Sequence, residues 1–498
     1  MMGREQRSNG ADGRVSDGAT SPRRPGWRRS RGGPSVDGRV RIDPAPPGRI
    51  AARSSAEAVA TTLGDRHREA RRGAAILLAF VMIGFSVAPW LNAVTGEPAN
   101  KDYDLWQQTG DLARTGADVY PKGPGIFPFM YPPACAAMLA PLSILPRALF
   151  VDSLLLINSV AWGACILLSI KLASGRAGGH WPGLYLLPSL AVIPFVHDTY
   201  LLGQPALVLL ALILGAFVLL RHGRPIPAGA LIAVAAAIKA YPILMVGYLV
   251  YRRQWRATAA TVVTLLALMF VAPMAFRAPS QVREDFTLWA RGMLFKYDEN
   301  SMAQRPDRAY SFKNQSVQAT VHRLARPVLA NGEANKTWRV NLLDLTFRQT
   351  TWLMLGTVGG ICLFYLGTSW GATRGGPPAD AVDGAMVTIL ILMFAPLSFN
   401  YSYVWLIFPL TLLLHLGRSA PARSSLRRWC QGGIVASVGL LALALPMLKT
   451  AQAYGNVFFA GAALLLVLGV ILRWGDLSLS APEPAEIPAF AWVATRPA

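Results

Sequence analysis

The segment GAAILLAFVMIGFSVAPWL, residues 73–91, decides the fold class of this chain. It carries no charged side chain, and its 19 residues would form a helix roughly 28 Å long at about 1.5 Å per residue. That length matches the hydrocarbon core of a bilayer, which is about 30 Å thick. Because further apolar segments of similar character follow, the sequence predicts an all-α polytopic membrane protein.

The composition agrees with this fold class. Of the 498 residues, 53% are hydrophobic and 15% are charged, whereas soluble domains carry about 25% charged residues. The net charge of +21 could indicate a nucleic-acid partner. Arginine in short loops, however, orients membrane proteins, so membrane lipids are the expected partners and nucleic acid is not. The four cysteines show no C-x-x-C pairing, which argues against a disulfide framework or a metal site.

The apolar segments after the first predict about ten to thirteen spans in total. They lie near residues 131–146, 148–172, 183–201, 204–220, 226–250, 256–276, 349–370, 385–398, 403–417, 432–448 and 456–472. The first of these could be a short span or a re-entrant helix. Two stretches, 226–250 with Lys239 and Tyr241-Pro242, and 385–417 with SFNYSY, have basic residues at both ends and predict broken hairpins of short helices.

Three regions differ in character along the chain. Residues 1–73 are arginine-rich and lack apolar periodicity, so we expect a disordered cytoplasmic tail. Residues 74–475 form the transmembrane domain, and residues 476–498 a C-terminal tail. Arg71 and Arg72 precede the first span, which predicts a cytoplasmic amino terminus in a multi-pass protein of the plasma (inner) membrane. The two larger polar loops, 95–130 and 277–347, are then extracytoplasmic.

Candidate chemistry begins with KDYDLW, residues 101–106. Its two carboxylates could clamp a metal for a sugar nucleotide, provide a catalytic base, or belong to an ordinary polar loop. Lys239 is the other notable charge, because a cation within an apolar stretch costs about 2.5–3.5 kcal/mol on insertion scales. We expect it to face a cavity or a partner, with snorkelling to the interface as the alternative.

An ordered set of motifs is more informative than any one of them. It consists of TGADVY (115–120), YPP (131–133), LLGQPALVLLAL (201–212), PAGALIAVAAAIKAYPILMVGYLVYRRQWR (227–256), FKNQSVQATVHRLARP (312–327) and APLSFNYSYVWLIFPLTLLL (395–414). Over roughly residues 74–475 the chain resembles glycosyltransferase family 87. The resemblance implies a GT-C-type helix bundle in the cell envelope. It further implies inverting transfer of a sugar, typically mannose, from a polyprenyl-phosphate donor to a lipid or glycan acceptor at the outer face, without metal or cofactor.

The resemblance also suggests roles for individual residues. The catalytic base of the family is an aspartate of the first outer loop, which Asp102 fits best and Asp104 second. Lys239 and Arg323 are candidates for binding the donor phosphate. Substrate-binding candidates are Tyr131, His197, Gln204, Asn314, Gln315, His322, Asn400 and Tyr401. Many members carry Ser-Trp and then a histidine near the last motif, where this chain reads Ser-Phe-Asn-Tyr (398–401), so only Asn400 or Tyr401 could assist the base there.

Two alternatives remain open at the level of sequence. A lipid or glycan transporter (flippase) would explain the broken helices and Lys239 equally well. Long polar loops on one face, and no evident inverted repeat, favour the enzyme. An oligosaccharide ligase that uses a diphosphate donor is the other alternative, and it stays within transferase chemistry.

Overall fold

The computed structural model describes residues 47–95, 101–123, 128–299, 301–302, 306–331, 338–370, 376–444, 448–475 and 477. The chain forms two compact units, Met1–Thr62 and Leu63–Ala498, and the site lies in the second. Helix α1 (Pro47–Thr95) begins inside the segment expected to be an unstructured tail. Residues 1–46 and nearly all of 476–498 lie outside the described residues, so the expectations for them stay predictions.

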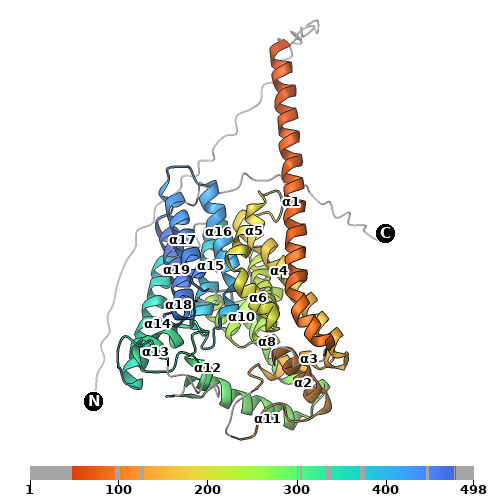
Figure 1. Ribbon diagram of the computed structural model, residues 1–498, viewed down its shortest axis with the longest axis vertical. Helices are drawn as coiled ribbons and strands as arrows, with labels where there is room; N and C mark the ends of the chain where they lie inside the picture. The colour runs from red at the N-terminus through yellow and green to blue at the C-terminus, as the bar shows by residue number, and fades with distance from the viewer. Residues whose placement is uncertain are drawn as a thin grey trace, which may run out of the picture. The chain divides into compact units, whose positions relative to one another are not determined.

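The second unit is almost entirely helical, as the sequence predicts (Figure 1). After α1 come α2 (Lys101–Thr115), α3 (Pro133–Leu139), α4 (Arg147–Ser174), α5 (Gly183–Ala191), α6 (Ile193–Leu201), α7 (Ala206–Arg221), α8 (Pro225–Ile238), α9 (Met245–Tyr251), α10 (Trp255–Leu266), α11 (Pro279–Trp289), α12 (Pro306–Ala309), α13 (Val317–Ala325), α14 (Phe347–Ser369), α15 (Gly376–Phe394), α16 (Ile407–Ser419), α17 (Ser425–Ala442), α18 (Lys449–Ala453) and α19 (Asn456–Trp474). One hairpin, β1 (Tyr297–Asp298) with β2 (Ser301–Met302), is the only sheet among the described residues.

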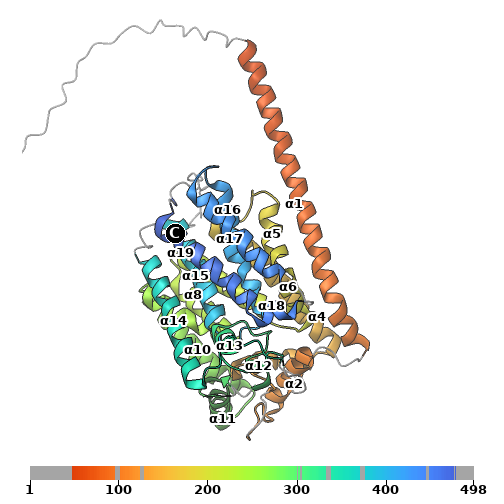
Figure 2. The ribbon, with the colours of Figure 1, turned by 60° about the vertical axis from the view of Figure 1, so that its left-hand side comes forward.

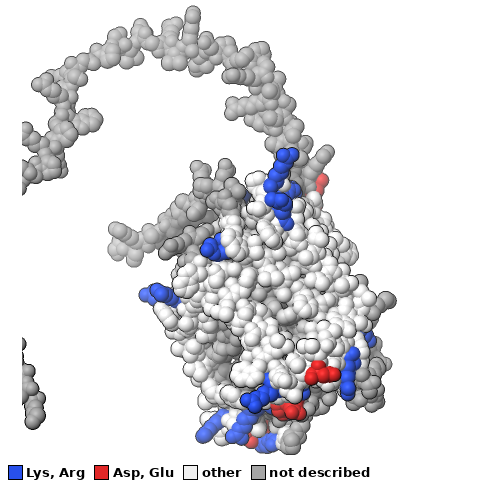
Figure 3. Space-filling view, turned by 90° about the vertical axis from the view of Figure 1, so that its left-hand side faces the viewer, with Lys and Arg blue, Asp and Glu red and all other residues white. Residues whose placement is uncertain are grey.

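Six helices in the described part of the chain are long and apolar enough to cross a membrane. They are Glu69–Thr95, Arg147–Ser174, Trp255–Ala275, Phe347–Ser369, Gly376–Phe394 and Asn456–Trp474. The pair α5 and α6, bent by 68°, raises the count to seven if it is one span. The expected ten to thirteen is therefore too high by this measure, because several apolar segments fold into helices shorter than a bilayer. In Figure 3, the charged side chains lie mostly toward the two ends of the visible face.

The helices differ in how deeply they are buried in the bundle. In α15, 78% of the apolar window is buried, against 11% in α14, so α15 is central and α14 is peripheral. A helix that is apolar all round, as α7 and α8 are, must be covered by neighbours or by lipid. Helices α8 and α10 approach so closely that a Cβ on Gly229 would lie 2.3 Å from the carbonyl oxygen of Ala257.

The predicted breaks in two apolar segments are confirmed. Helix α8 ends before Lys239, and a 3-10 turn at Tyr241–Leu244 leads into α9. Helix α15 ends at Phe394, and a 3-10 helix at Asn400–Leu406 leads into α16. Pro242 and Pro396 explain the interruptions, since proline cannot donate to the helical ladder.

The helices of the polar loops gather at one end of the second unit. Helices α2, α11, α12 and α13 lie there, together with the short apolar helix α3, at the lower end of Figure 1, and Figure 2 agrees for α2, α11, α12 and α13. Segment 131–146 contributes α3 and a 3-10 turn at Leu142–Ile144, neither of which has the length of a span. Both of the expected polar loops, 95–130 and 277–347, thus contribute helices to this end.

Candidate functional site

The first turn of α2 carries both candidate carboxylates, Asp102 and Asp104. Two residues along a helix correspond to a rotation of about 200°, so the two side chains leave opposite faces. The structure gives each a different set of partners. A D-x-D pair on a helix is therefore not arranged to hold one cation between its two carboxylates.

Asp102 belongs to a hydrogen-bonded chain of three side chains. The Nε2 atom of Gln204 donates to Oδ2 of Asp102 at 2.6 Å. The hydroxyl of Tyr131 donates to Oε1 of the same Gln204 at 2.9 Å. Tyr131 and Gln204 are buried, and Asp102 is half-buried. The structure thus brings together three candidates from three separate motifs of the sequence.

The turn between α6 and α7 places Gln204 against α2. Gly203 has φ +66°, a left-handed conformation that glycine adopts without strain. A Cβ at this position would lie 3.0 Å from the ring of Tyr103. Tyr103 in turn donates its hydroxyl to the carbonyl of Tyr200 at 2.7 Å. Tyr103 stands between Asp102 and Asp104 in the sequence, so its packing fixes the start of α2 on the bundle.

Lys239 lies among three tyrosine rings at the break after α8. Its Nζ atom is 5.4 Å from the ring centre of Tyr131, 5.6 Å from that of Tyr241 and 4.9 Å from that of Tyr401. It also donates to the hydroxyl of Tyr401 at 3.3 Å. Aromatic faces attract a cation but leave most of its N–H donors without an acceptor. The charges of Lys239 and Asp102 lie close enough to interact.

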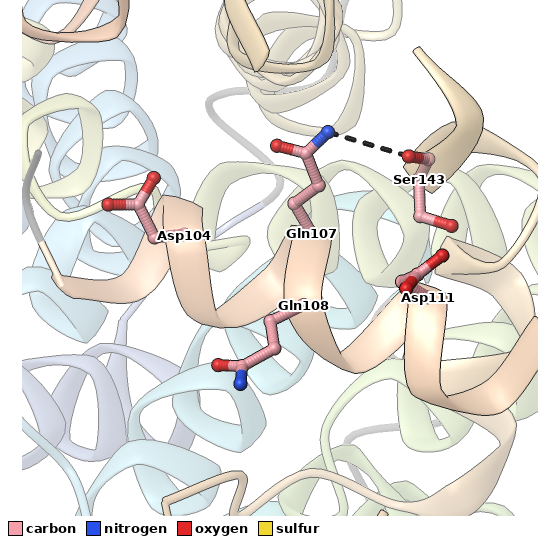
Figure 4. Close-up of a pocket in the computed structure, with 5 residues that line it drawn as sticks. All are labelled: Asp104, Gln107, Gln108, Asp111 and Ser143. Carbon is pink, nitrogen blue, oxygen red and sulfur yellow. Dashed lines mark hydrogen bonds between the residues drawn. The ribbon is translucent and has the colours of Figure 1, made fainter. Parts of the chain in front are cut away.

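Asp104 faces the other way and pairs with Arg147 at the start of α4. The pair has two contacts, Nε to Oδ1 at 2.8 Å and Nη2 to Oδ2 at 3.2 Å. Arg147 also donates to the carbonyls of Asn92 and Ala93 near the end of α1. Asp104 thus helps to tie three helices together. Figure 4 shows this face of α2, where Asp104, Gln107, Gln108, Asp111 and Ser143 line a shallow pocket of about 370 Å³.

Arg323 lies in the protein interior, away from any surface that could receive a donor phosphate. It is 0% exposed, and its guanidinium donates to the carbonyls of Ala453, Ser311 and Asn314 at 2.8, 2.8 and 2.7 Å. Burial lowers its pKa to about 9. This is the geometry of a cross-link between α13, the preceding loop and α18, and it favours a structural role over phosphate binding.

Asn314 and Gln315 also bind backbone rather than facing an open cavity. Asn314 donates to the carbonyls of Ala309 and Pro396 at 2.8 and 2.9 Å, and Gln315 donates to those of Phe312 and Gln452 at 2.6 and 2.7 Å. Both side chains are completely buried. Asn314 joins the second polar loop to the segment around Pro396, and Gln315 joins it to α18.

The remaining candidates are dispersed. His322 is buried beside Arg326, and burial first, then that charge, lowers its pKa to about 4. Asn400 donates to Oε1 of Gln452 at 2.8 Å, and its own Oδ1 is buried without a hydrogen-bond partner. His197 is exposed on α6 and meets Phe85 of α1 edge to face. The structure brings none of these three into the hydrogen-bonded chain of Asp102.

A comparison with protein families decides the class of the molecule. The model of glycosyltransferase family 87 matches residues 129–396. The chain belongs to glycosyltransferase family 87. It is therefore a membrane glycosyltransferase, as the sequence motifs suggested. No curated protein and no solved structure gives a significant match.

The family match does not cover the whole site. Tyr131, Gln204 and Lys239 lie within the matched residues, whereas Asp102 precedes them and Tyr401 follows them. The family match therefore supports the class of enzyme, and the role of Asp102 depends on its geometry in this glycosyltransferase.

Sequence reasoning missed several residues of the site. Tyr241 completes the group of rings around Lys239, and its place directly before Pro242 was the only available signal. Arg308, at the end of α12, is close enough for its charge to affect Tyr401. Tyr103 and Arg147 position α2, and no local pattern identifies either, because their partners are distant in the sequence.

Proposed function

We propose that this glycosyltransferase moves a sugar, mannose in the first instance, from a polyprenyl-phosphate donor to a hydroxyl of a lipid or glycan acceptor, with inversion. Asp102 is the catalytic base and Lys239 binds the donor phosphate. The observation that carries the proposal is the geometry around Tyr131. Its hydroxyl bonds to the Gln204 side chain that holds Asp102, and its ring centre lies 5.4 Å from Nζ of Lys239.

The reaction needs few groups. Asp102 accepts the proton of the acceptor hydroxyl, whose oxygen attacks the anomeric carbon of the donor. The bond from that carbon to the phosphate oxygen breaks, and polyprenyl phosphate leaves with the electron pair. Lys239 then compensates the additional negative charge on the phosphate, as a preorganised cation does in a site of low dielectric constant.

The position of Asp102 suits a base. A carboxylate in the first turn of a helix is stabilised by the positive end of the helix dipole. The hydrogen bond from Gln204 stabilises the charged form further. Both effects stabilise the charged form of the carboxyl group, and the half-buried side chain of Asp102 stays within reach of a substrate.

The tyrosine surroundings of Lys239 suit a phosphate ligand. The ammonium group has three donors, of which Tyr401 accepts one at 3.3 Å, so a phosphate oxygen can complete its coordination. Arg308, whose charge acts on Tyr401, is a second cation for the donor. Arg323 is left out of the donor site, since backbone carbonyls hold its guanidinium.

We place this polar end outside the cytoplasm. Arg71 and Arg72 precede the first span, and arginine beside a span favours the cytoplasmic side. The end of that span leads directly into the loop with α2. A lipid-linked donor is consistent with this placement, since sugar nucleotides are cytoplasmic and a lipid monophosphate needs no metal when a cation of the protein neutralises it.

The competing proposal is a transporter for the same lipid, which would use Lys239 without chemistry. The experiment is incubation of the protein in proteoliposomes with synthetic polyprenyl-phosphate mannose, labelled in both the sugar and the prenyl chain, and a total lipid extract as the acceptor pool. Transfer releases one polyprenyl phosphate for each mannose that moves to the acceptor. Unaltered donor that moves between leaflets would instead indicate transport and would contradict the proposal.

A further inference from the structure

The chain from Tyr131 through Gln204 to Asp102 determines which way the amide of Gln204 points. An ionised carboxylate only accepts hydrogen bonds, so the atom of Gln204 that faces Asp102 is Nε2, which donates to it at 2.6 Å. The oxygen Oε1 then faces Tyr131, whose hydroxyl donates to it at 2.9 Å. Without the Tyr131 hydroxyl, Oε1 loses this hydrogen bond and the amide is held less firmly against Asp102.

The backbone around Gln204 is fixed as well. Its N–H donates to the carbonyl of Thr199 at 2.9 Å. Gly203 lies against the ring of Tyr103, so that a Cβ there would lie 3.0 Å from ring atoms, and Gln204 itself is 2% exposed. A side chain that is held at both its backbone and its amide can fix the plane of the carboxylate it contacts.

Other charged and titratable groups also face Asp102. Lys239, Tyr131 and Tyr401 all interact with its charge. Asp104, on the same helix, is turned toward Arg147. Gln204 differs from these groups because it donates a direct, short hydrogen bond and carries no charge of its own, so its effect on Asp102 does not change with pH.

We propose that Gln204, oriented by Tyr131, is the positioning residue for the base Asp102. This inference rests on the proposed function. Gln204 holds the carboxylate toward the acceptor and favours its ionised form, while Tyr131 holds the amide in place by donating to its Oε1. In positioning the base, Gln204 and Tyr131 do not bind the donor. Loss of Gln204 therefore changes the turnover and its pH dependence, and leaves the affinity for donor intact.

The test compares Gln204→Met, which keeps the shape and removes the amide, with Tyr131→Phe. The control is Gln107→Leu, which removes an amide from α2 that donates to the carbonyls of Ser143 and Leu145. Each variant is purified, checked for a monodisperse elution profile, and assayed in proteoliposomes from pH 4 to pH 9. Synthetic polyprenyl-phosphate mannose is the donor and a total lipid extract the acceptor pool.

For Gln204→Met we expect the acid limb of the pH–rate profile to move up by about one pH unit, because a hydrogen bond to a charged group is worth about that much. At the plateau kcat falls about tenfold, with KM for the donor unchanged. Tyr131→Phe shifts the limb in the same direction by a smaller amount, and it provides the test if Gln204→Met does not fold. The control Gln107→Leu should keep the acid limb of the pH–rate profile where it lies in the wild-type protein.

Two results overturn the inference. If the wild-type protein transfers sugar but both variants keep the wild-type pH profile, Gln204 does not position the base and the proposed function stands. If the wild-type protein transfers no sugar, the proposed function fails and this inference fails with it.

Discussion

Asp102→Asn tests whether Asp102 acts as a catalytic base or has only a structural role, because asparagine has nearly the same shape as aspartate. The hydroxyl of Tyr131 holds the Gln204 amide so that its Nε2 faces residue 102. An asparagine at 102 can offer its oxygen to this Nε2 group, and its NH₂ group then takes the place of the other carboxylate oxygen. That NH₂ group cannot accept a proton from an acceptor hydroxyl.

The expected loss follows from this geometry. General base catalysis contributes about 10²–10⁴-fold to a rate, and the NH₂ group adds a wrongly placed donor, so we expect a loss of kcat of about 10³-fold or more. Because the hydrogen bond with Gln204 survives, the melting temperature of Asp102→Asn should stay within about 1 °C of wild type, which corresponds to about 1 kcal/mol in a chain of this length.

Asp104→Asn is the matched control, since it makes the same chemical change two residues away. The side chains of Arg147 and Asp104 are 27% and 43% exposed, and ion pairs at this level of exposure contribute about 1 kcal/mol or less. We expect a small drop in melting temperature and a loss of activity below about tenfold, since about 1.4 kcal/mol corresponds to tenfold. Initial rates at saturating donor measure both variants. Full activity of Asp102→Asn, or an equal loss in both, would refute the assignment of the base.

Four further predictions follow from the site and its surroundings. Lys239→Met should raise KM for the donor by about 10–100-fold, because a hydrogen bond to a charged group contributes that much to binding. Lys239→Arg should raise this KM less. Titration of the donor in the transfer assay measures KM for both variants. Gly203→Ala must adopt φ +66° against the ring of Tyr103, which costs about 1–2 kcal/mol, so thermal unfolding should occur earlier and kcat should fall. Arg323→Met leaves several buried carbonyls unpaired at about 1–3 kcal/mol each; we expect poor folding in detergent, and a well-folded variant with an increased KM for donor would contradict the structural role. Burial lowers the pKa of His322 to about 4. As the pH falls below about 6.5, this histidine therefore binds a proton in the unfolded chain before it does so in the folded protein, and up to about 3 kcal/mol of the free energy of unfolding is lost by pH 4. His322→Gln should make the melting temperature depend less on pH between about 6.5 and 4.

The sequence predicted the fold class and the breaks in two apolar segments because these depend on local chemistry. A charge and a proline within an apolar stretch, as at Lys239 and Pro242, cannot continue an ordinary span. The number of spans was not predictable in the same way. Whether an apolar segment crosses the bilayer or ends early depends on tertiary packing, as in segment 131–146, which forms only α3 and a 3-10 turn.

Some of the candidate residues could likewise be found from local chemistry, and others could not. The type of side chain alone identified Asp102, Gln204 and Lys239, and the structure places these three around Tyr131. Arg323 was selected as a cation in a polar loop, and its sequence context gives no sign that it points inward. The direction in which a short helix such as α13 turns its charged side chain is set by segments more than a hundred residues away, here Ala453.

The two aspartates of KDYDLW have complementary roles. Their spacing on the helix directs the carboxylate of Asp104 to Arg147 and that of Asp102 to Gln204. Asp104 pairs with Arg147, which also binds the carbonyl of Asn92, so the start of α2 is held where α1 and α4 meet. Because Asp102 lies on the opposite face of that anchored turn, the ion pair of Asp104 with Arg147 also determines where Asp102 lies on the bundle. A slip of α2 by two residues would move one aspartate into the place of the other and break the ion pair or the hydrogen bond with Gln204. Tyr103, which packs against Gly203, opposes that slip.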